Sequence, residues 1–336
     1  METPVDKVAA LSVDQRRELF EQAANRQAMK PAIMEKDFWV CWVRRQLFID
    51  PELKDHLIFK GGTSLSKVYG LIERFSEDID LVLDWRLLGY GQGLIDPYQN
   101  FDSKGKQDRF NKEINAKATV YIEKNLLPKF NELFANGPGL TVSIDPSDPY
   151  SVNVSYPMAF KEAYIRPAVR LEIGPLASWV PSKQYAIQPY AAAVIPGVFE
   201  NPSCPVVAIA AERTFWEKVA ILHKEAHRPG VIPLRHSRHY YDVHKLAVSS
   251  AAKSALADLS LLEEVVKFKE RFYPSAWARY DLAKPGTFKL VPNAAHLSEL
   301  EKDYKSMAVM LFGKVPTFEL IVDTLRTLED QINQQA

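Results

Sequence analysis

Residues 57–83 read LIFKGGTSLSKVYGLIERFSEDIDLVL, and three patterns within this stretch decide the fold class. The apolar run at 57–59 predicts a short strand that ends at a pair of glycines. Apolar residues at helical spacing follow, which predicts an amphipathic helix from Thr63 to Ile72. Polar and apolar residues then alternate from Asp78 onwards, and this alternation predicts a second strand.

The turn between the first strand and the helix is a candidate phosphate-binding site. It consists of Gly61, Gly62, Thr63 and Ser64. Glycines let the backbone approach a ligand closely, and the two hydroxyl residues add N–H and O–H groups at the start of a helix. We therefore predict that this turn holds phosphate.

Two carboxylates follow on the second strand. Asp78 and Asp80 are two residues apart, so both side chains point to one face of the sheet while the apolar neighbours point to the other. Mg²⁺ relieves the repulsion of such a pair and is typically bound by a few carboxylates, waters and substrate phosphates. Glu172, in the alternating stretch 170–173, is a candidate third carboxylate for a two-metal phosphoryl-transfer site. A surface strand with solvated acids is the open alternative.

The chain divides into three parts by pattern. Helical signals dominate residues 1–49, where Ser12 is a candidate N-cap and Pro31 begins a further helix. A strand-rich, mixed part covers 50–204, and helices dominate 205–336. This order predicts an α+β fold, with a mixed β-sheet core between N-terminal helices and a C-terminal helical domain.

The remaining elements follow from local spacing and composition. Residues 86–110 are Gly-rich and charged, which predicts a long loop, and the stretch 181–205, rich in Pro, Ala and Tyr, predicts a connection. Strands are expected at 140–144, 151–155 and 168–173. Helices are expected at 111–134, 216–226, 240–248, 259–272 and 317–332.

Composition excludes several classes of protein. Of 336 residues, 25% are charged and 47% are hydrophobic, which are ordinary globular values and exclude a disordered chain or a coiled coil. Because 42 basic residues balance 42 acidic ones, a nucleic-acid binder that uses its whole surface is disfavoured, whereas a local basic patch stays open.

The sequence also favours a cytoplasmic location. The N-terminus lacks the basic and apolar regions of a secretory signal, and no apolar run approaches the roughly 18 residues of a membrane helix. The two cysteines are too few for a disulfide framework, and Cys41 lies in an apolar run where an inert buried thiol is expected.

Several motifs together resemble those of the AbiEii/MenT-type nucleotidyltransferases, a branch of the DNA polymerase β-like superfamily. The first motif corresponds to 59–65 with 74–81, and two later ones to 213–218 and 235–242. The tripeptide Glu35-Lys36-Asp37 belongs to the same pattern.

The resemblance implies a role for each matching residue. Gly62, Thr63 and Ser64 would hold the nucleoside triphosphate, and Asp78 and Asp80 would bind the metal. Glu172 matches through its strand context, as a metal ligand or deprotonating group. Lys218 falls on a lysine important for activity that contacts the triphosphate, and Asp242 falls on the later aspartate motif. The C-terminal helices inherit no specific role.

A basic, histidine-rich segment surrounds the last of these residues. Residues 205–250 contain seven Lys or Arg and four Asp or Glu, so we expect an anion-facing patch for triphosphate or RNA. Arg228, Arg235 and Arg238 are its candidate phosphate contacts. His223 and His227 are one helical turn apart and form a possible zinc pair, but the nearby cations favour an anion instead. A solvated surface is the plain alternative.

The sequence therefore predicts a Mg²⁺-dependent nucleotidyltransferase that moves a nucleotide from a nucleoside triphosphate to an acceptor hydroxyl, with RNA and in particular the tRNA 3′ end as acceptor. A protein hydroxyl stays open as an alternative acceptor. Members of the resembling family act as toxins of type IV toxin–antitoxin or abortive-infection systems, which implies a cognate antitoxin as partner. Two alternatives remain open: an inactive nucleotide- or RNA-binding module, and a metal-dependent phosphohydrolase.

Overall fold

The chain forms two compact units in the computed structural model, which describes residues 3–91, 97–99, 101–135, 137, 139–162, 165–199 and 202–336. The sheet unit comprises Met1–Val68 and Ser76–Ala208. The helical unit comprises Tyr69–Phe75 and Ile209–Ala336. The three-part division expected from the sequence stays a prediction.

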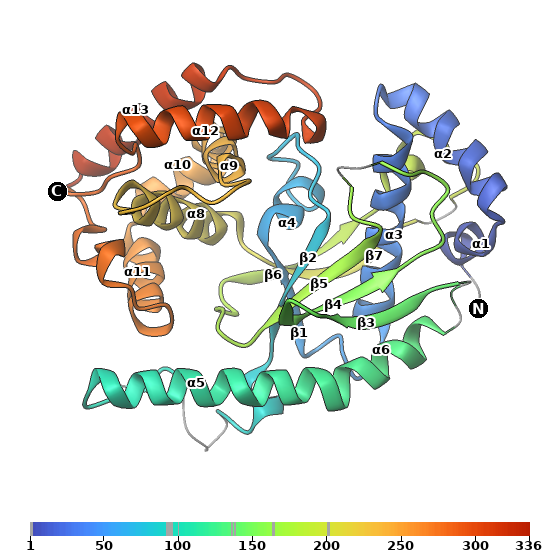
Figure 1. Ribbon diagram of the computed structural model, residues 1–336, viewed down its shortest axis with the longest axis horizontal. Helices are drawn as coiled ribbons and strands as arrows, with labels where there is room; N and C mark the ends of the chain where they lie inside the picture. The colour runs from blue at the N-terminus through green and yellow to red at the C-terminus, as the bar shows by residue number, and fades with distance from the viewer. Residues whose placement is uncertain are drawn as a thin grey trace. The chain divides into compact units, whose positions relative to one another are not determined.

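A mixed sheet organises the sheet unit (Figure 1). Among the described residues it has seven strands in the order β3-β4-β5-β2-β1-β7-β6. β2 lies parallel to β5 and antiparallel to β1, and β1 lies parallel to β7. The strands are β1 (Leu57–Lys60), β2 (Asp78–Leu83), β3 (Thr141–Asp145), β4 (Asp148–Ser155), β5 (Ala168–Gly174), β6 (Ser182–Ile187) and β7 (Cys204–Ile209). The predicted α+β class with a mixed sheet is confirmed.

N-terminal helices cover this sheet, as predicted. Thr3 and Ser12 begin the first two helices with capping boxes, in which side chain and backbone bond reciprocally. The long helix α3 crosses behind the strands, where it packs against β2 and β5 and is buried along most of its length (Figure 1). The helices are α1 (Pro4–Ala10), α2 (Val13–Gln27), α3 (Pro31–Ile49), α4 (Gly61–Lys67), α5 (Lys104–Tyr121), α6 (Leu127–Phe134) and α7 (Tyr190–Val194).

Burial in this unit settles the state of its cysteine thiols. Cys41 of α3 and Cys204 of β7 are both buried and form no disulfide. Burial raises the pKa of the Cys41 thiol to about 11, so the thiol stays protonated at neutral pH. The expected inert buried thiol at this position is confirmed.

The helical unit is built around α8 and α9. α9 packs against α8, α10, α12 and α13, and its buried face includes Tyr240, Tyr241 and Asp242. Its helices are α8 (Ala211–Ala226), α9 (Ser237–Ala247), α10 (Ser250–Ala257), α11 (Ser260–Phe272), α12 (Ala294–Ser306) and α13 (Phe318–Asn333). Short 3₁₀ turns lie at Ala276–Ala278, Tyr280–Leu282 and Met307–Met310. None of the helices that the structure describes in either unit is long and apolar enough to cross a membrane.

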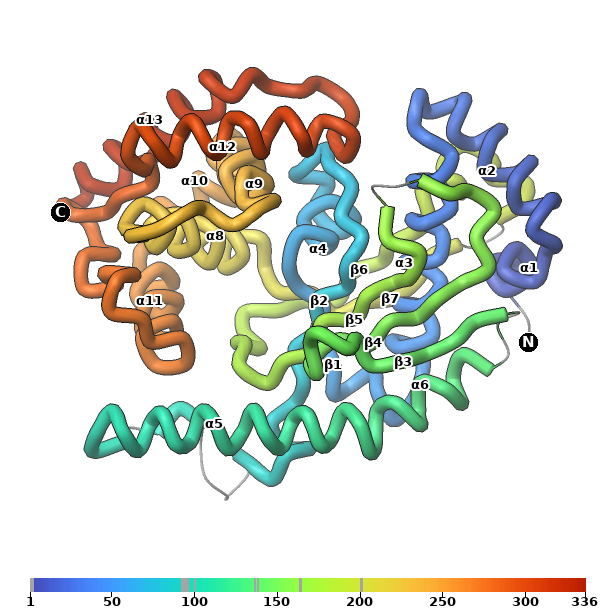
Figure 2. The backbone as a smooth tube through the Cα atoms, in the orientation of Figure 1, coloured from blue at the N-terminus to red at the C-terminus, as the bar shows by residue number. Residues whose placement is uncertain are grey.

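The predicted helix after the glycine turn is shorter than its apolar spacing indicates. α4 ends at Lys67, and Gly70 adopts a positive φ of 61°, which turns the chain out of the helical path. Figure 2 lets the reader follow the chain as it turns away from α4. Residues 69–75 then join the helical unit, where Arg74 forms a β-bridge with Leu311. Pairing with a distant segment therefore outweighs the local helical pattern up to Ile72.

The predicted loop at 86–110 and the predicted connection at 181–205 both contain regular elements. Within 86–110, a 3₁₀ helix extends from Trp85 to Leu88, and α5 begins at Lys104 behind the N-cap Ser103. Residues 92–96 and 100, part of the predicted loop, lie outside the described residues. Within 181–205, β6 forms at the edge of the sheet and α7 packs against α2 and α3. Proline-rich composition does not reveal these long-range contacts.

The expected helix at 111–134 is present with an internal irregularity. The segment Ile122–Leu126 (η2) is a π-helix between α5 and α6. Pro128 lies in the first turn of α6 and has no N–H to donate, so the preceding turn widens. Figure 1 shows the three pieces as one continuous rod along the sheet unit.

Candidate active site

The two aspartates predicted to bind metal lie where β2 begins, on one face of the sheet. β2 and β5 pair in parallel with Asp78 opposite Arg170 and Asp80 opposite Glu172. Register partners on neighbouring strands share a face, so Glu172 lies directly beside Asp80. The structure therefore brings the predicted third carboxylate next to the pair, although Arg170 also holds it in an ion pair of 3.3 Å.

Gly61 is required for the position of Asp80. It adopts φ of 78°, a conformation that glycine reaches without strain, and a methyl group at this position would overlap the Asp80 carboxylate. Within the described residues the Asp80 carboxylate has no ion pair or hydrogen bond to another side chain. The carboxylate thus lies directly over the glycine turn.

The hydroxyl groups of the turn fix its shape. Thr63 Oγ1 donates to the carbonyl oxygen of Asp78 at 2.6 Å, and Ser64 Oγ donates to that of Gly61 at 2.8 Å. Both side chains are buried. Thr63 therefore ties the turn to the start of β2, and Ser64 closes the turn on itself. With both hydroxyls used in this way, the backbone N–H groups of the turn are its donors for a phosphate.

Lys36 supports the strand that carries the aspartates. Its buried ammonium donates to the carbonyl oxygens of Arg166 and Ala168 at 2.9 and 2.5 Å, and lies 3.7 Å from the Glu77 carboxylate. Burial lowers the pKa of Lys36 to about 8, although the carboxylates of Glu77 and Asp78 oppose the shift. Lys36 thus connects α3 to the residue before Asp78 and to the start of β5.

The two neighbours of Lys36 make equally buried contacts. The Glu35 carboxylate accepts from the backbone N–H groups of Ala159 and Phe160, at 2.8 and 3.1 Å. Asp37 pairs with Lys67, the last residue of α4, at 2.5 Å and accepts from the N–H of Tyr190 at 2.7 Å. The motif at residues 35–37 therefore makes buried contacts inside the sheet unit, two of them next to β2 and α4. The sequence pattern alone did not reveal these partners.

A second cluster, in the helical unit, brings together Lys218 and Asp242. The Lys218 ammonium lies 2.7 Å from Asp242 Oδ2. Arg74 binds both oxygens of the same carboxylate, at 2.6 and 2.8 Å. Burial disfavours the ionised Asp242, but Arg74 and then Lys218 outweigh burial and hold its pKa well below the usual range. The sequence interpretation had not assigned a role to Arg74, which no local pattern connects to residue 242.

The three arginines predicted to contact phosphate have different surroundings. Arg228 pairs with Glu225 at 2.5 Å and lies over the Trp277 ring at 4.7 Å. Arg235 adopts a left-handed φ of 65°. Arg238 makes no ion pair or hydrogen bond with the part of the chain that the structure describes. Arg238 is therefore the candidate whose guanidinium is available, whereas Arg228 is held internally.

The first residue of the predicted histidine pair, His223, makes structural contacts. His223 Nε2 donates to the carbonyl oxygen of Arg279 at 2.9 Å, and its Nδ1 accepts from the N–H of Lys289 at 3.1 Å. Burial lowers the pKa of His223 to about 4, which matches the neutral ring that these bonds need. With both nitrogens occupied, His223 has no lone pair for zinc, so the preference against a zinc pair is supported.

The donor set on β2 fits a hard divalent cation. Asp78 and Asp80 supply carboxylate oxygens, which Mg²⁺ prefers, and water and phosphate oxygens would complete its coordination. No group of three or more His, Cys, Asp or Glu side chains in the described ranges is arranged to hold a metal ion. The two carboxylates of β2 are thus the residues that would hold it, and the assignment of Glu172 as a ligand stays a prediction.

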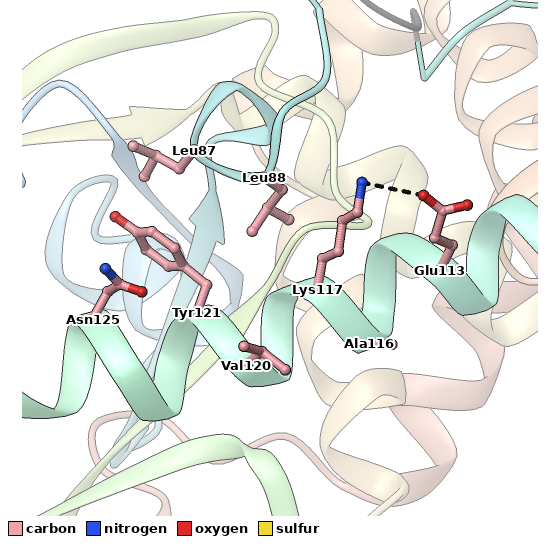
Figure 3. Close-up of a pocket in the computed structure, with 8 residues that line it drawn as sticks. All are labelled: Leu87, Leu88, Glu113, Ala116, Lys117, Val120, Tyr121 and Asn125. Atoms are coloured by element: carbon pink, nitrogen blue, oxygen red, sulfur yellow. Dashed lines mark ion pairs between the residues drawn. The ribbon is translucent and has the colours of Figure 1, made fainter.

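A groove of about 430 Å³ lies elsewhere in the sheet unit, between the 3₁₀ helix at 85–88 and α5 (Figure 3). It is mainly apolar, with the Lys117–Glu113 ion pair of 3.1 Å at one end. Its lining residues are Leu87, Leu88, Glu113, Ala116, Lys117, Val120, Tyr121 and Asn125. None of them is a predicted site residue, so the groove is separate from the carboxylate pair.

A carboxylate pair held over a glycine turn defines a candidate phosphoryl-transfer enzyme. The model of the family described as "Nucleotidyl transferase AbiEii toxin, Type IV TA system" matches residues 45–327. This chain therefore belongs to the AbiEii nucleotidyltransferase toxin family, and the resemblance inferred from its motifs is confirmed. It is a nucleotidyltransferase of a type IV toxin–antitoxin system, a class that uses a nucleoside triphosphate and generally a divalent metal.

A solved structure is also similar to this chain. It is MenT4, a nucleotidyltransferase toxin from Mycobacterium tuberculosis H37Rv, with 16% sequence identity and a TM-score of 0.41. The match covers 93% of this chain and 97% of that one. Among curated proteins, none matches this sequence.

Proposed function

We propose that this nucleotidyltransferase is Mg²⁺-dependent and transfers a nucleotide from a nucleoside triphosphate to a hydroxyl group of RNA, with the 3′ end of tRNA as the acceptor. The observation that carries the proposal is the carboxylate pair of β2, with Asp80 lying directly over Gly61. Membership of the toxin family supports the reaction class.

The sheet unit contributes the residues for the reacting phosphate. Backbone N–H groups of Gly62, Thr63 and Ser64 bind the triphosphate, and Asp78 and Asp80 hold the metal. Mg²⁺, when bound there, offsets the charge of the phosphates and of the leaving pyrophosphate. The acceptor hydroxyl attacks the α-phosphorus in line, its oxygen forms the new P–O bond, and pyrophosphate leaves.

Glu172 is the proposed group that takes the proton of the acceptor hydroxyl or adds a metal ligand. Its place beside Asp80 on β5 supports either role. Arg170 pairs with the Glu172 carboxylate at 3.3 Å and so helps to orient it.

The helical unit contributes Lys218, whose ammonium is the proposed phosphate contact, and Asp242, the proposed catalytic residue that pairs with this ammonium at 2.7 Å. A lysine is a compact cation on a flexible stem, so it suits a phosphate better than base-specific recognition. Replacing Lys218 with Ala or Glu should therefore weaken nucleotide binding more than RNA binding.

RNA binding is proposed for the basic segment that includes Arg238 and Arg235. A chain of zero net charge that binds an acidic polymer must concentrate its cations locally. RNA affinity should then fall with rising salt, because each neutralised phosphate releases counterions. Replacing both arginines with Gln should flatten the salt slope by roughly one unit for each lost contact.

One experiment tests the reaction and separates it from its alternatives. The purified protein is incubated with each labelled nucleoside triphosphate and total RNA, with Mg²⁺ or with chelator. We expect Mg²⁺-dependent label in tRNA and pyrophosphate release that requires RNA. Pyrophosphate or phosphate release without RNA would indicate a phosphohydrolase, and nucleotide binding without any release would indicate an inactive module.

The biological setting proposed here is a toxin that acts in the cytoplasm and is neutralised by a cognate antitoxin, consistent with the family. Expression should therefore slow growth unless the antitoxin is present. The Asp80→Ala variant, expressed at the same level, should leave growth unaffected.

A further inference from the structure

The segment Tyr69–Phe75 lies in the sequence between the proposed phosphate turn and the proposed metal strand, yet it belongs to the helical unit. Backbone hydrogen bonds hold it there. The N–H of Phe75 donates to the carbonyl oxygen of Met310 at 2.8 Å, and the N–H of Phe312 donates to that of Glu73 at 3.0 Å. These bonds fix the backbone on either side of Arg74.

Side chains of α9 bind the same segment. Lys245 pairs with the Glu73 carboxylate at 2.7 Å, and Tyr241 Oη accepts from the N–H of Glu73 at 3.2 Å. Asp242 binds Arg74, whose side chain is only 5% exposed. α9 thus holds both Glu73 and Arg74. Of these contacts, only the pair formed by Arg74 and Asp242 includes a proposed site residue.

Arg74 and Lys218 bind Asp242 in different ways. The guanidinium is planar and rigid, and it occupies both carboxylate oxygens at 2.6 and 2.8 Å. Lys218 makes a single contact of 2.7 Å through a flexible stem of four carbons. Arg74 can therefore keep Asp242 ionised and paired alone, whereas Lys218 can turn away without leaving a bare buried carboxylate.

The surroundings of Lys218 favour such a movement toward an anion. Burial lowers the pKa of Lys218, Asp242 opposes that shift, and the charges of Arg74 and Arg238 add to it. Asp242 is the one carboxylate that pairs with Lys218 within the described residues, and it already carries the arginine. A phosphate oxygen would offer the Lys218 ammonium an anion that it does not share with Arg74.

We propose that Arg74 is a positioning residue, which holds Asp242 so that Lys218 is free to leave it and bind a phosphate of the nucleotide. The inference rests on the proposed role of Lys218. Without Arg74, Asp242 would depend on Lys218 as its cation, and a buried carboxylate would then retain the lysine against the nucleotide.

The test measures binding of a fluorescent nucleoside triphosphate with Mg²⁺ and without RNA, so turnover does not contribute. Lys218→Met should weaken binding by about tenfold, the effect of one lost charge contact. Arg74→Met should weaken it to a similar extent, and Arg74→Lys should lie between Arg74→Met and the wild type. Lys245→Met is the matched control, because it removes an anchor of the same segment without contacting Asp242. It should bind within twofold of the wild type.

The double variant Arg74→Met/Asp242→Asn separates positioning from simple damage. The neutral amide introduced by Asp242→Asn no longer retains Lys218, so the double variant should bind nucleotide more tightly than Arg74→Met alone. If the arginine only stabilised the fold, the second change would weaken binding further, and that result would overturn the inference.

The remaining outcomes distinguish the two proposals. Wild-type binding by Lys218→Met would refute the proposed role of Lys218 and with it this inference. Weakened binding by Lys218→Met together with Arg74→Met equal to Lys245→Met would overturn only the role of Arg74. Circular dichroism checks the fold of each variant, and if Arg74→Met does not fold, wild-type binding by Arg74→Lys overturns the inference.

Discussion

Replacing Gly61 with Ala tests whether the position of Asp80 determines activity. Gly61 has φ of 78°, and an added methyl group would overlap the Asp80 carboxylate. Gly89 is a matched control, since its φ is 82° and an added methyl group there meets no described atom within 4 Å. Both glycines belong to the sheet unit, so the two variants share the backbone strain and differ in the overlap.

The two effects have different magnitudes. Alanine in the left-handed region costs roughly 1–2 kcal/mol, and both variants incur this cost. The overlap adds little to the cost in Gly61→Ala, because the Asp80 side chain can rotate away and breaks no hydrogen bond or ion pair with the described residues when it does. The displaced carboxylate no longer holds the metal, and a misplacement of about 1 Å can cost on the order of 100-fold in rate.

The assay compares transfer of label to RNA with the free energy of unfolding in urea. We expect both variants to be destabilised to the same extent within about 1 kcal/mol, while Gly61→Ala loses roughly 100-fold in transfer relative to Gly89→Ala. Equal transfer by the two variants would refute the argument that Asp80 must lie over the turn. A much lower stability of Gly61→Ala would show that the overlap is relieved by the backbone instead.

Three further predictions concern buried and unpaired charges. Asp80→Ala should abolish Mg²⁺-dependent labelling and keep the free energy of unfolding within about 0.5 kcal/mol, since this carboxylate has no partner among the described residues to lose; wild-type labelling by a folded variant would refute its metal role. The wild type should gain stability relative to Lys36→Met between about pH 8 and 10, because the folded protein loses the proton of Lys36 near pH 8 whereas the unfolded chain keeps it to higher pH. Urea unfolding at both pH values measures the difference in unfolding free energy between wild type and variant. An equal difference at the two pH values would contradict the lowered pKa. Asp242→Asn should cost about 3–5 kcal/mol, since Arg74 and Lys218 would remain as buried cations without their anion; a loss below about 1 kcal/mol would contradict this.

The acid side of the last prediction has a definite sign. The pKa of Asp242 lies well below its usual range in the folded protein, so its contribution to stability is complete above the unfolded value of about 3.9. The contribution declines as the pH falls below that value toward the folded pKa. Asp242→Asn lacks this carboxylate, so the stability gap between wild type and variant should narrow under acid conditions.

Local signals were sufficient to predict the strand, the turn and the second strand. In any strand, successive side chains point to opposite faces, so the alternation from Asp78 assigns each residue to a face without knowledge of the fold. A double glycine likewise indicates, in any fold, a place where the backbone can come close to another group. The same signals predicted a mixed sheet with N-terminal helices. They could not predict that β2 pairs with β5 in the register that puts Asp80 beside Glu172, because strand pairing depends on segments that are distant in sequence.

Local signals also misled where a distant partner decides the conformation. Residues 69–72 continue the helical spacing of the preceding turn, but the helix has already ended, and residues 73–75 form backbone bonds with residues 310–312. Arg74 and Asp242 are 168 residues apart, so no local pattern connects them. The structure thus adds a residue to the candidate site that spacing alone could not identify.

The buried tripeptide of α3 shows what this long-range information specifies. Successive residues of a helix point about 100° apart, so Glu35, Lys36 and Asp37 reach different segments of the sheet unit. Their partners include the residue before Asp78 and the last residue of α4, which border the metal pair and the phosphate turn. Apolar replacements of such buried charges are often neutral or stabilising in other proteins, so stability alone does not explain them. Their hydrogen bonds explain them better, because a charged pair holds its two segments in few relative positions, whereas an apolar contact allows many.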